Sequence, residues 1–317
     1  MSVRPESLCV HVLNVGDGDS IVLQFPADVN GRRKFALVDC YKSTKTIDYL
    51  KKLGVNELEF VCATHPHYDH IAGIPKVLDT FKGSIQEFWD SGFRHTSLTY
   101  DKIINKIKDD TNINFIRVTS GMERIINDVK VCVLAPSIYL RNRYDTYGVN
   151  INNASVVLKL EYKDPDAVNP SVIILGGDAQ FDSWAKVIEE FPHHEKTDNP
   201  EQKVEWKKSF KPLNCNVLKV AHHGSKHGTA LEYVEKLDPE YAIVSCSDSS
   251  RHGFPHEIAW LSLKEVSHMG VKDRIYFTDY SEPGKPKSGT TVVITNGTTT
   301  HDIVSLGEGT DVVPKPP

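Results

Sequence analysis

Short runs of aliphatic and β-branched residues recur along the chain and are separated by segments with helical periodicity. Apolar runs bounded by glycine, proline, asparagine or aspartate are typical of β-strands. They occupy residues 9–16, 20–25, 34–40, 58–65, 129–136, 155–162, 171–179, 216–223, 241–247, 274–280 and 290–297. Apolar residues spaced three and four apart predict helices over residues 44–54, 74–81, 99–110, 182–191, 229–237 and 257–270. The alternation indicates a mixed α/β chain.

The same pattern suggests one domain with two irregular segments. Thr229 and Glu232 have the spacing of a capping box, which predicts a helix start directly after "HHGSKHG". Residues 191–212 lack periodicity and predict a charged surface insertion, and residues 306–317 predict a flexible C-terminal tail. We see no internal repeat and no linker, so we expect residues 1–305 to form a single domain.

Composition narrows the class of protein. No run of about 18 apolar residues exists and the first residues lack a signal-peptide core, so we expect a cytoplasmic protein without a membrane segment. The net charge of −5 does not favour general nucleic-acid binding, although it allows a local basic groove. The cysteines are well separated in or beside apolar runs, which predicts reduced, buried thiols. They are Cys9, Cys40, Cys62, Cys132, Cys215 and Cys246.

Polar side chains stand where predicted strands end. Asp39 ends "FALVD", Asp178 ends "IILGGD", and His222 and His223 end "LKVAHH". The segment "HPHYDH", residues 65–70, follows another apolar run. Strand ends meet at one edge of most α/β folds, so we expect these groups to converge.

The spacing within "HPHYDH" favours two metal sites over one. His65 and His67 are separated by one residue, while Asp69 and His70 continue into the next helix. One short turn can thus present two imidazoles to one cation and a carboxylate with an imidazole to its neighbour.

The alternative is that these residues are structural. Most lone histidines are surface or satisfied core residues, and we apply that interpretation to His11, His95, His193, His194, His268 and His301. Asp39 and Asp178 alone would also fit helix caps or turns. Four polar residues beside a buried strand are costly without partners, however, so we interpret the series as ligands.

These blocks resemble a known family. "THPHYDH" resembles the HxHxDH signature of the metallo-β-lactamase superfamily, and the order Asp39, "HPHYDH", Asp178, "HHG" follows that superfamily. The blocks "LNVGDGDSIVL", "LVDC", "NNASVVLKLEY", "ILGGDA", "LKVAHHGSKHGT" and "RHGFPHEIAW" are similar to the metallo-β-lactamase domain of the competence protein ComEC and its stand-alone relatives. The resemblance runs from about residue 8 to residue 297. The same branch includes phosphorylcholine esterases.

The resemblance implies a four-layer αββα sandwich with two metals at one edge. By position, His65 and His67 would hold the first metal, and Asp69, His70 and His223 the second. Asp178 would bridge the two, and Asp39 would support the ligand turn from behind. His223 is favoured over His222 as the ligand, with His222 contacting substrate or supporting a ligand. Asp69, Asp178 and His222 would be the catalytic residues.

Two departures from the family pattern concern the surroundings of the metals. The middle histidine ligand of many members is absent and "NNAS" stands there, so the first metal would have a more open face. Asn153 and Ser155 are then candidates to contact substrate or metal-bound water, or else turn residues. Phe254 replaces the histidine of a late Gly-His-Pro block, and either His252 or His256 could substitute for it.

The function implied is hydrolysis by a dinuclear metal centre. The nitrogen and oxygen ligands permit zinc or manganese, and a metal-bridging hydroxide would attack a phosphodiester of DNA or RNA. Lys226 would add a cation for phosphate or be an ordinary solvated lysine, and the lysines at 203, 207, 208 and 211 would form a track for a nucleic-acid backbone or a solvated face. The alternatives are a small phosphodiester, such as a cyclic nucleotide or phosphorylcholine-type ester, and a lactonase or β-lactamase-like hydrolase. A binding module without activity is the least favoured.

Overall fold

Two mixed β-sheets form the centre of the computed structural model, which describes residues 4–93, 96–140, 150–191, 213–266, 274–279 and 288–307. Within these residues the first sheet has the order β15 (Asp302–Ser305), β14 (Thr291–Thr295), β1 (Leu8–Val12), β2 (Ser20–Ala27), β3 (Arg33–Cys40), β4 (Leu58–Ala63), β5 (Ile85–Asp90), β6 (Asn114–Arg117). The second has the order β13 (Ile275–Phe277), β12 (Tyr241–Val244), β11 (Val217–Lys219), β10 (Ser171–Leu175), β9 (Val157–Tyr162), β8 (Val129–Ala135), β7 (Glu123–Ile126).

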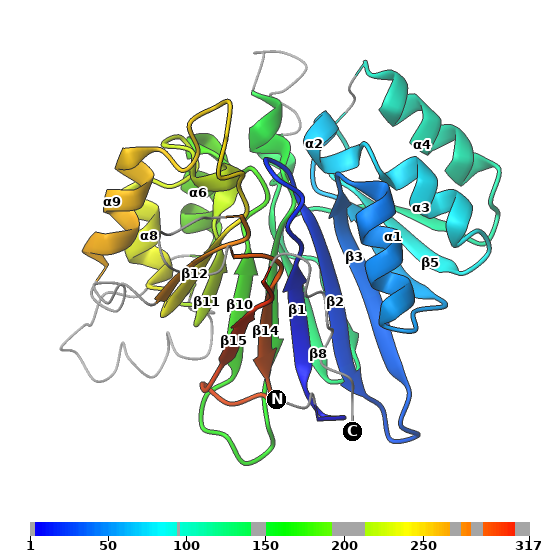
Figure 1. Cartoon of the computed structure of the whole chain (residues 1–317), viewed down its shortest axis with the longest axis horizontal. Helices are drawn as coiled ribbons and strands as arrows, with labels where there is room; N and C mark the ends of the chain where they lie inside the picture. Colours follow the sequence, from blue (N-terminus) through cyan, green and yellow to red (C-terminus); the bar gives the residue numbers. More distant parts are fainter. Residues whose placement is uncertain are drawn as a thin grey trace.

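Helices cover the outer face of each sheet (Figure 1). On one side lie α1 (Ser43–Lys52), α3 (Ile74–Thr80) and α4 (Leu98–Lys108), and on the other lie α6 (Phe181–Glu190), α8 (Leu231–Leu237) and α9 (Glu257–Glu265). The four-layer αββα architecture expected from the sequence is therefore confirmed.

Three apolar layers hold the sandwich together. Between the sheets lie the inward-facing residues of both, including Phe60 and Trp89, whose rings stack with centroids 4.1 Å apart. Separate clusters join each sheet to its helices, one around Leu50 and Phe88 and the other around Trp184 and Leu218. Because both faces of the central strands are buried, these strands read as continuous apolar runs.

The parallel portions of the sheets place the site. Strands β3, β4, β5 and β6 are mutually parallel, and so are β10, β11, β12 and β13. Their carboxyl ends open at one edge, which also carries the short helix α2 (Tyr68–Ile71) and the β1–β2 connection, both at the top of Figure 1. The polar residues that follow these strands are thereby brought together.

Several local expectations differ from the structure. Strands β5, β6, β7 and β15 were not predicted. The last three are four-residue strands with partly exposed residues, and β5 has the polar pair Gln86 and Glu87, so none forms a conspicuous apolar run. The helix predicted over 257–270 ends at Glu265, with Val266 extended, and residues 267–270 lie outside the described residues.

The predicted capping box at Thr229 and Glu232 is wrong. Helix α8 begins after Ala230, which makes no side-chain cap. The Thr229 hydroxyl is buried and donates instead to the carbonyl of Ala221, at 3.4 Å. The threonine therefore ties the start of α8 to the turn that carries "HHG".

The remaining expectations divide between described and undescribed residues. All six cysteines are buried and free. His11 and His301 are buried and hydrogen-bonded, as expected of core histidines. His95, His193, His194 and His268, the insertion from residue 192 with its lysines, and the tail from residue 308 lie outside the described residues. None of the helices described has the length and hydrophobicity needed to span a bilayer.

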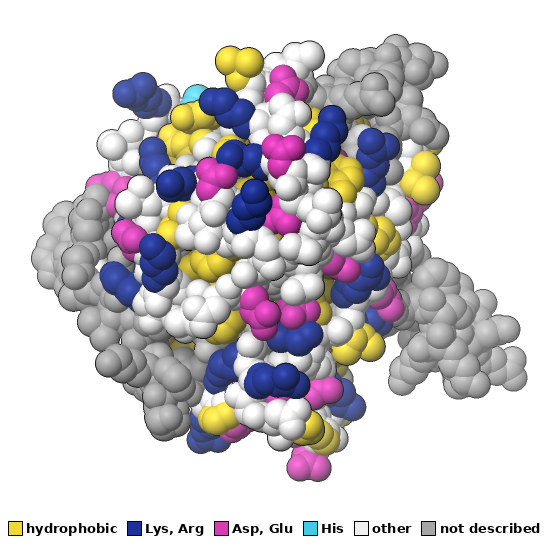
Figure 2. Space-filling model, turned by 90° about the vertical axis from the view of Figure 1, so that its right-hand side faces the viewer, with side chains coloured by type: hydrophobic (Ala, Val, Ile, Leu, Met, Phe, Trp, Pro, Cys, Tyr) yellow, Lys and Arg dark blue, Asp and Glu magenta, His cyan; other side chains and the backbone are white. Residues whose placement is uncertain are grey.

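The outer face of the α1, α3 and α4 layer carries mixed charges. In Figure 2, lysine and arginine side chains are interspersed with aspartate and glutamate over this face. Such a surface does not provide the single-sign field that draws a polyanion. The face shown in Figure 2 therefore has no extended patch of one charge among its described residues.

Candidate metal centre

The ligand turn begins where β4 ends. Strand β4 is buried, and Thr64 and His65 continue it to the edge of the sheet. His67 is extended and precedes α2, whose first turn contains Asp69 and His70. The change from strand to helix directs the two halves of "HPHYDH" toward different partners.

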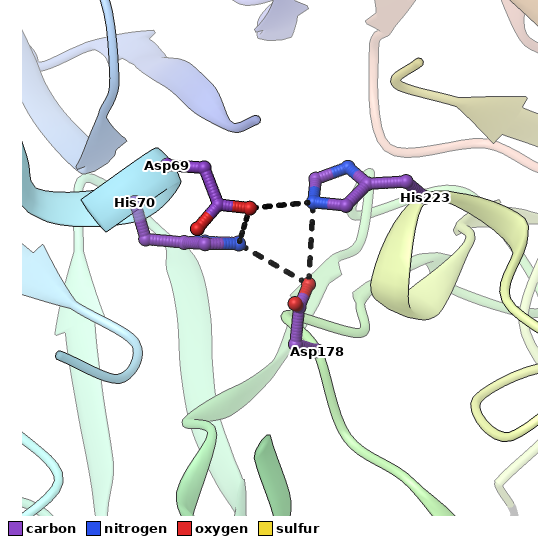
Figure 3. A group of neighbouring side chains, drawn as sticks. All are labelled: Asp69, His70, Asp178 and His223. Carbon is purple, nitrogen blue, oxygen red and sulfur yellow. Dashed lines mark ion pairs between the residues drawn. The ribbon is translucent and has the colours of Figure 1, made fainter. Parts of the chain in front are cut away.

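One group of potential ligands consists of Asp69, His70, Asp178 and His223, whose nearest ligand atoms all lie within 4.8 Å of one another (Figure 3). Oδ1 of Asp178 is 3.2 Å from Nε2 of His70 and 3.7 Å from Nε2 of His223. Oδ2 of Asp69 is 3.6 Å from Nε2 of His223 and 3.9 Å from Nε2 of His70. Two imidazoles and two carboxylates thus converge on one point.

A second group shares Asp178. His65, His67 and Asp178 also bring their ligand atoms within 4.8 Å of one another. Oδ2 of Asp178 is 3.7 Å from Nε2 of His65, and it is 3.7 Å from Nε2 of His222. The two oxygens of one carboxylate therefore face two different sets of imidazoles.

Buried polar atoms without hydrogen-bond partners make this place a fit for metal ions. Nε2 of His65, His70 and His223 and Oδ1 of Asp178 are buried and make no hydrogen bond, although they face one another in the ion-pair contacts given above. Leaving such atoms without hydrogen bonds costs stability, whereas imidazole nitrogen and carboxylate oxygen are ordinary ligands of divalent ions. The donor set and its spacing therefore fit two cations on either side of Asp178.

The imidazoles and carboxylates of the cluster shift one another's pKa values so that their charged forms are favoured. Burial works against the charged form of His70 and of His223, but the Asp178 carboxylate beside both holds the pKa of each imidazole above its usual value. Burial likewise opposes ionisation of Asp178, yet His70 and His223 hold the pKa of this carboxyl well below its usual range. Protonated imidazoles thus balance the carboxylates when no metal does, and metal binding would displace their protons.

Groups behind the cluster fix the orientation of the ligands. Oδ2 of Asp39 accepts a hydrogen bond from Nδ1 of His70 at 2.7 Å, and the same carboxylate accepts from the backbone N–H and the hydroxyl of Thr64. Nδ1 of His223 donates to the carbonyl of Ser245 at 2.8 Å. The hydroxyl of Ser155 accepts from the backbone N–H of Asp178 at 3.0 Å. With Nδ1 occupied, His70 and His223 each turn Nε2 toward the centre.

The two histidines of "HHG" serve opposite sides of Asp178. Both residues have left-handed backbone conformations, with φ of 50° for His222 and 54° for His223, which non-glycine residues seldom adopt. Their ring planes are inclined by 69°. Nδ1 of His222 is 3.0 Å from the side-chain amide of Gln180, and Nε2 is 3.5 Å from that of Asn152. Nε2 of His222 faces Oδ2 of Asp178, as Nε2 of His65 does, whereas Nε2 of His223 faces Oδ2 of Asp69.

Other residues predicted to contact substrate have structural roles or lie at the rim. The side-chain oxygen of Asn153 accepts from the backbone N–H of Ser183 and its amide nitrogen donates to Asp182, so Asn153 caps the start of α6. Lys226 is exposed, and its backbone N–H donates to Nδ1 of His256.

The late loop presents an apolar ring in place of a histidine. The ring of Phe254 lies 5.6 Å from that of His222 and 5.8 Å from that of His223, centroid to centroid. His252 is exposed and stacks on Phe254, and Nε2 of His256 lies 3.2 Å from the carbonyl of His252. Both nitrogens of His256 thus face backbone groups, and it is the ring of Phe254 that lies against His222 and His223.

Sequence reasoning missed the amides and hydroxyls around the ligands. Asn152, Gln180, Thr64 and Ser245 each contact a ligand histidine or its support. Ser245 carries no signal in the sequence. Asn152 precedes Asn153 and Gln180 lies two residues after Asp178, so closeness in sequence to a predicted site residue is the signal that could have identified them.

The four-layer αββα sandwich, with histidines and aspartates in this order at its open edge, is similar to the arrangement that the metallo-β-lactamase signature predicts, and the edge is a candidate two-metal site. The sequence model of the metallo-β-lactamase superfamily matches residues 14–128. The chain is 26% identical over 211 residues to ComE operon protein 3 of Bacillus subtilis, a match that covers 67% of this chain and 23% of that protein. It is 25% identical over 138 residues to ribonuclease Z of Clostridium perfringens, covering 39% of this chain and 44% of that one.

One solved structure matches most of the chain at low identity. The metallo-β-lactamase fold protein YhfI from Bacillus subtilis shares 13% identity, with a TM-score of 0.49 over 91% of this chain and 99% of that chain. The matches to the curated relatives span less than half of their own length. The resemblance to the superfamily that the sequence motifs predict is confirmed.

Proposed function

We propose that this protein is a metal-dependent phosphodiesterase with two divalent ions in its site, and that nucleic acid is its first substrate class. The observation that carries the proposal is the position of Asp178, whose two oxygens face separate sets of imidazoles. A carboxylate in that position suits a bridge between two cations better than a single site.

We assign the ligands as follows. His65 and His67 would hold the first metal, and Asp69, His70 and His223 the second, with Asp178 shared. His222 would join the first metal, because its Nε2 lies 3.7 Å from Oδ2 of Asp178. His222 would then replace the middle histidine ligand that this sequence lacks. Nε2 of His222 and Nε2 of His65 both face Oδ2 of Asp178. Nitrogen and oxygen donors of this kind suit Zn²⁺ or Mn²⁺.

The chemistry of such a centre suits phosphodiesters. Two divalent ions in one site activate water and neutralise the charge on the attacking and departing oxygens of an in-line displacement. This chain's own residues would hold the ligands in place from behind, and the ring of Phe254 packs beside those of His222 and His223. Because Phe254 has no proton to donate, protonation of a leaving group would fall to another group at the rim.

The relatives support nucleic acid ahead of small esters. Ribonuclease Z is by its name an enzyme that acts on RNA, and its match covers part of this chain. A small phosphodiester, such as a cyclic nucleotide, needs the same metal chemistry and is therefore the alternative that a test must separate.

A substrate panel tests the proposal. The protein loaded separately with Zn²⁺ and with Mn²⁺ is assayed on single-stranded DNA, double-stranded DNA, RNA, a cyclic nucleotide, bis(p-nitrophenyl) phosphate, a phosphorylcholine ester and a lactone. We expect cleavage of the polynucleotides and of bis(p-nitrophenyl) phosphate, and loss of both in Asp178→Asn. Asp110→Asn is the matched control, because Asp110 is a buried carboxylate that accepts from Gly83 and Asn112 away from the histidines. Turnover of the lactone with none on any phosphodiester would overturn the proposal.

A further inference from the structure

Two buried charges lie beneath the candidate metal centre, and Oδ1 of one of them, Asp19, is 3.9 Å from Nδ1 of His223. Asp19 also brings a ligand atom within 4.8 Å of those of Asp39 and His70, behind the two proposed ligand sets. Asp19, at the end of the β1–β2 connection, and Lys219, the last residue of β11, are each about 1% exposed and form a close ion pair. They come from different sheets. A buried ion pair seldom adds net stability, because desolvation offsets the attraction, so its presence here calls for another reason.

The segment that contains Asp19 contacts a ligand from each sheet. The backbone N–H of Asp19 donates to the carbonyl of Asp69 at 3.1 Å. The hydroxyl of Ser245 donates to the carbonyl of Gly18 at 2.8 Å, and the carbonyl of Ser245 accepts from Nδ1 of His223 at 2.8 Å. Residues 18–19 therefore link Asp69 to Ser245, whose carbonyl orients His223. Figure 1 shows the β1–β2 loop, which contains these residues, rising between the two halves of the sandwich.

The packing at Gly18 leaves this segment little freedom. A Cβ atom at Gly18 would lie 2.6 Å from the carbonyl oxygen of Asp69 and 2.4 Å from the ring of Tyr41. The backbone thus approaches the ligand turn as closely as a glycine allows. A small displacement of the segment would shift Asp69 relative to His223.

We propose that the Lys219–Asp19 pair is a positioning device that locks residues 18–19 and so fixes the distance between Asp69 and His223. The inference depends on the proposed ligand sets. The pair governs the affinity of the second metal, because both ligands that the segment touches belong to that metal. We expect the first metal to keep its affinity, because the described contact behind its ligand His65 is with the hydroxyl of Thr64.

A purely electrostatic role predicts a different outcome. Lys219 would then serve as a fixed positive charge near the carboxylates, and its removal alone would leave Asp19 as an unpaired anion that attracts cations. A single substitution thus mixes two opposing effects. The electroneutral double substitution Lys219→Met with Asp19→Asn removes the pair at constant net charge and separates them.

A matched control is available in the same sheet. Lys159, on β9, is 3% exposed and pairs with Glu161 at 2.6 Å. The double substitution Lys159→Met with Glu161→Gln removes a lysine–carboxylate pair, whose carboxylate is 19% exposed and also faces Lys130, from residues that form no part of the metal groups. Any loss common to both double variants reflects fold stability.

The test is a Zn²⁺ titration of the metal-free proteins against a competing chelator, with Co²⁺ absorption spectra as a second readout of ligand geometry. For Lys219→Met/Asp19→Asn we expect one of two metals to bind about 10- to 100-fold more weakly and the other to keep its affinity. The Co²⁺ spectrum should change for that ion alone. The Lys159→Met/Glu161→Gln protein should match the wild type.

Each outcome bears on the inference. Unchanged affinity for both metals, or an equal loss of both, in a folded Lys219→Met/Asp19→Asn protein would overturn it. If that protein does not fold, Ser245→Ala removes only the hydroxyl bond to Gly18 and should weaken the same single metal, and an unchanged titration then contradicts the proposal. A wild-type protein that binds two metals but cleaves no phosphodiester would overturn the proposed function and leave this inference standing.

Discussion

Substituting Asp39 by asparagine tests the support behind His70 with a change of one atom. Asp39 has a left-handed backbone, with φ of 58°, a conformation that asparagine tolerates and alanine does not. Its carboxylate accepts three hydrogen bonds, from Nδ1 of His70 and from the N–H and hydroxyl of Thr64. An amide in its place has one acceptor and one donor end.

The expected effect follows from these contacts. If the amide oxygen stays with the N–H of Thr64, which donates to Oδ1, the amide nitrogen faces Nδ1 of His70. Nδ1 must then accept, so the metal-free imidazole loses its proton from Nδ1 and keeps the one on Nε2, the atom that faces Asp178. Loss of such a support costs about 10- to 100-fold in metal affinity, which corresponds to about 1.4 to 2.8 kcal/mol.

The assay is a Zn²⁺ titration of Asp39→Asn beside wild type and Asp110→Asn. We expect one metal to bind more weakly in Asp39→Asn, and thermal unfolding of the metal-free proteins to differ little. Wild-type affinity for both metals in Asp39→Asn would refute the argument that the Asp39 carboxylate sets the tautomer of His70.

Three further outcomes are expected. Asp178→Asn should weaken both metals, whereas loss of one alone, measured by elemental analysis, would contradict a shared bridge. His222→Ala should reduce the metal content from two towards one if His222 is a ligand, while two retained metals with impaired turnover would make it a substrate contact. Burial lowers the pKa of His11 to about 4, against about 6.5 in an unfolded chain, so the folded protein binds fewer protons between these values and loses stability as the pH falls through them. Between about pH 7 and about pH 5 this removes about 2 kcal/mol, so in metal-free protein the stability difference between wild type and His11→Gln should shrink by that amount, and parallel pH profiles would contradict it.

The ligand turn could be predicted because its chemistry is contiguous. "HPHYDH" contains four potential ligands in six residues, and its place after an apolar run is visible in the sequence. Asp178 and "HHG" follow buried strands, so the rule that parallel strands end at one edge was enough to bring them together. Short edge strands such as β6 and β15 escaped prediction, because their partly exposed residues form no apolar run.

Contacts over long separations could not be predicted in this way. The sides that His222 and His223 take depend on two consecutive left-handed residues, and sequence periodicity carries no information on backbone dihedrals of this kind. Asp19 and Lys219 are separated by 200 positions, and each alone reads as a surface charge. Asn153 was a candidate either to contact substrate or metal-bound water or to be a turn residue, because of its place in "NNAS", whereas its neighbour Asn152 is the residue that faces His222.

Because the candidate ligands come from both sheets, metal ions bound to them would also stabilise the contact between the sheets. Asp69 and His70 follow strand β4 of the first sheet, whereas Asp178 and His223 follow β10 and β11 of the second. Metal ions held by these residues would link the two halves at the open edge, and an ion present at about 100 times its dissociation constant stabilises the folded state by about 2.7 kcal/mol. Without metal, the raised pKa of His70 and His223 supplies positive charge in the same place. The same ion pairs that hold the edge together without metal must therefore be broken for metal to bind, which makes the affinity depend on pH and on how firmly Asp69 and His223 are held at their distance.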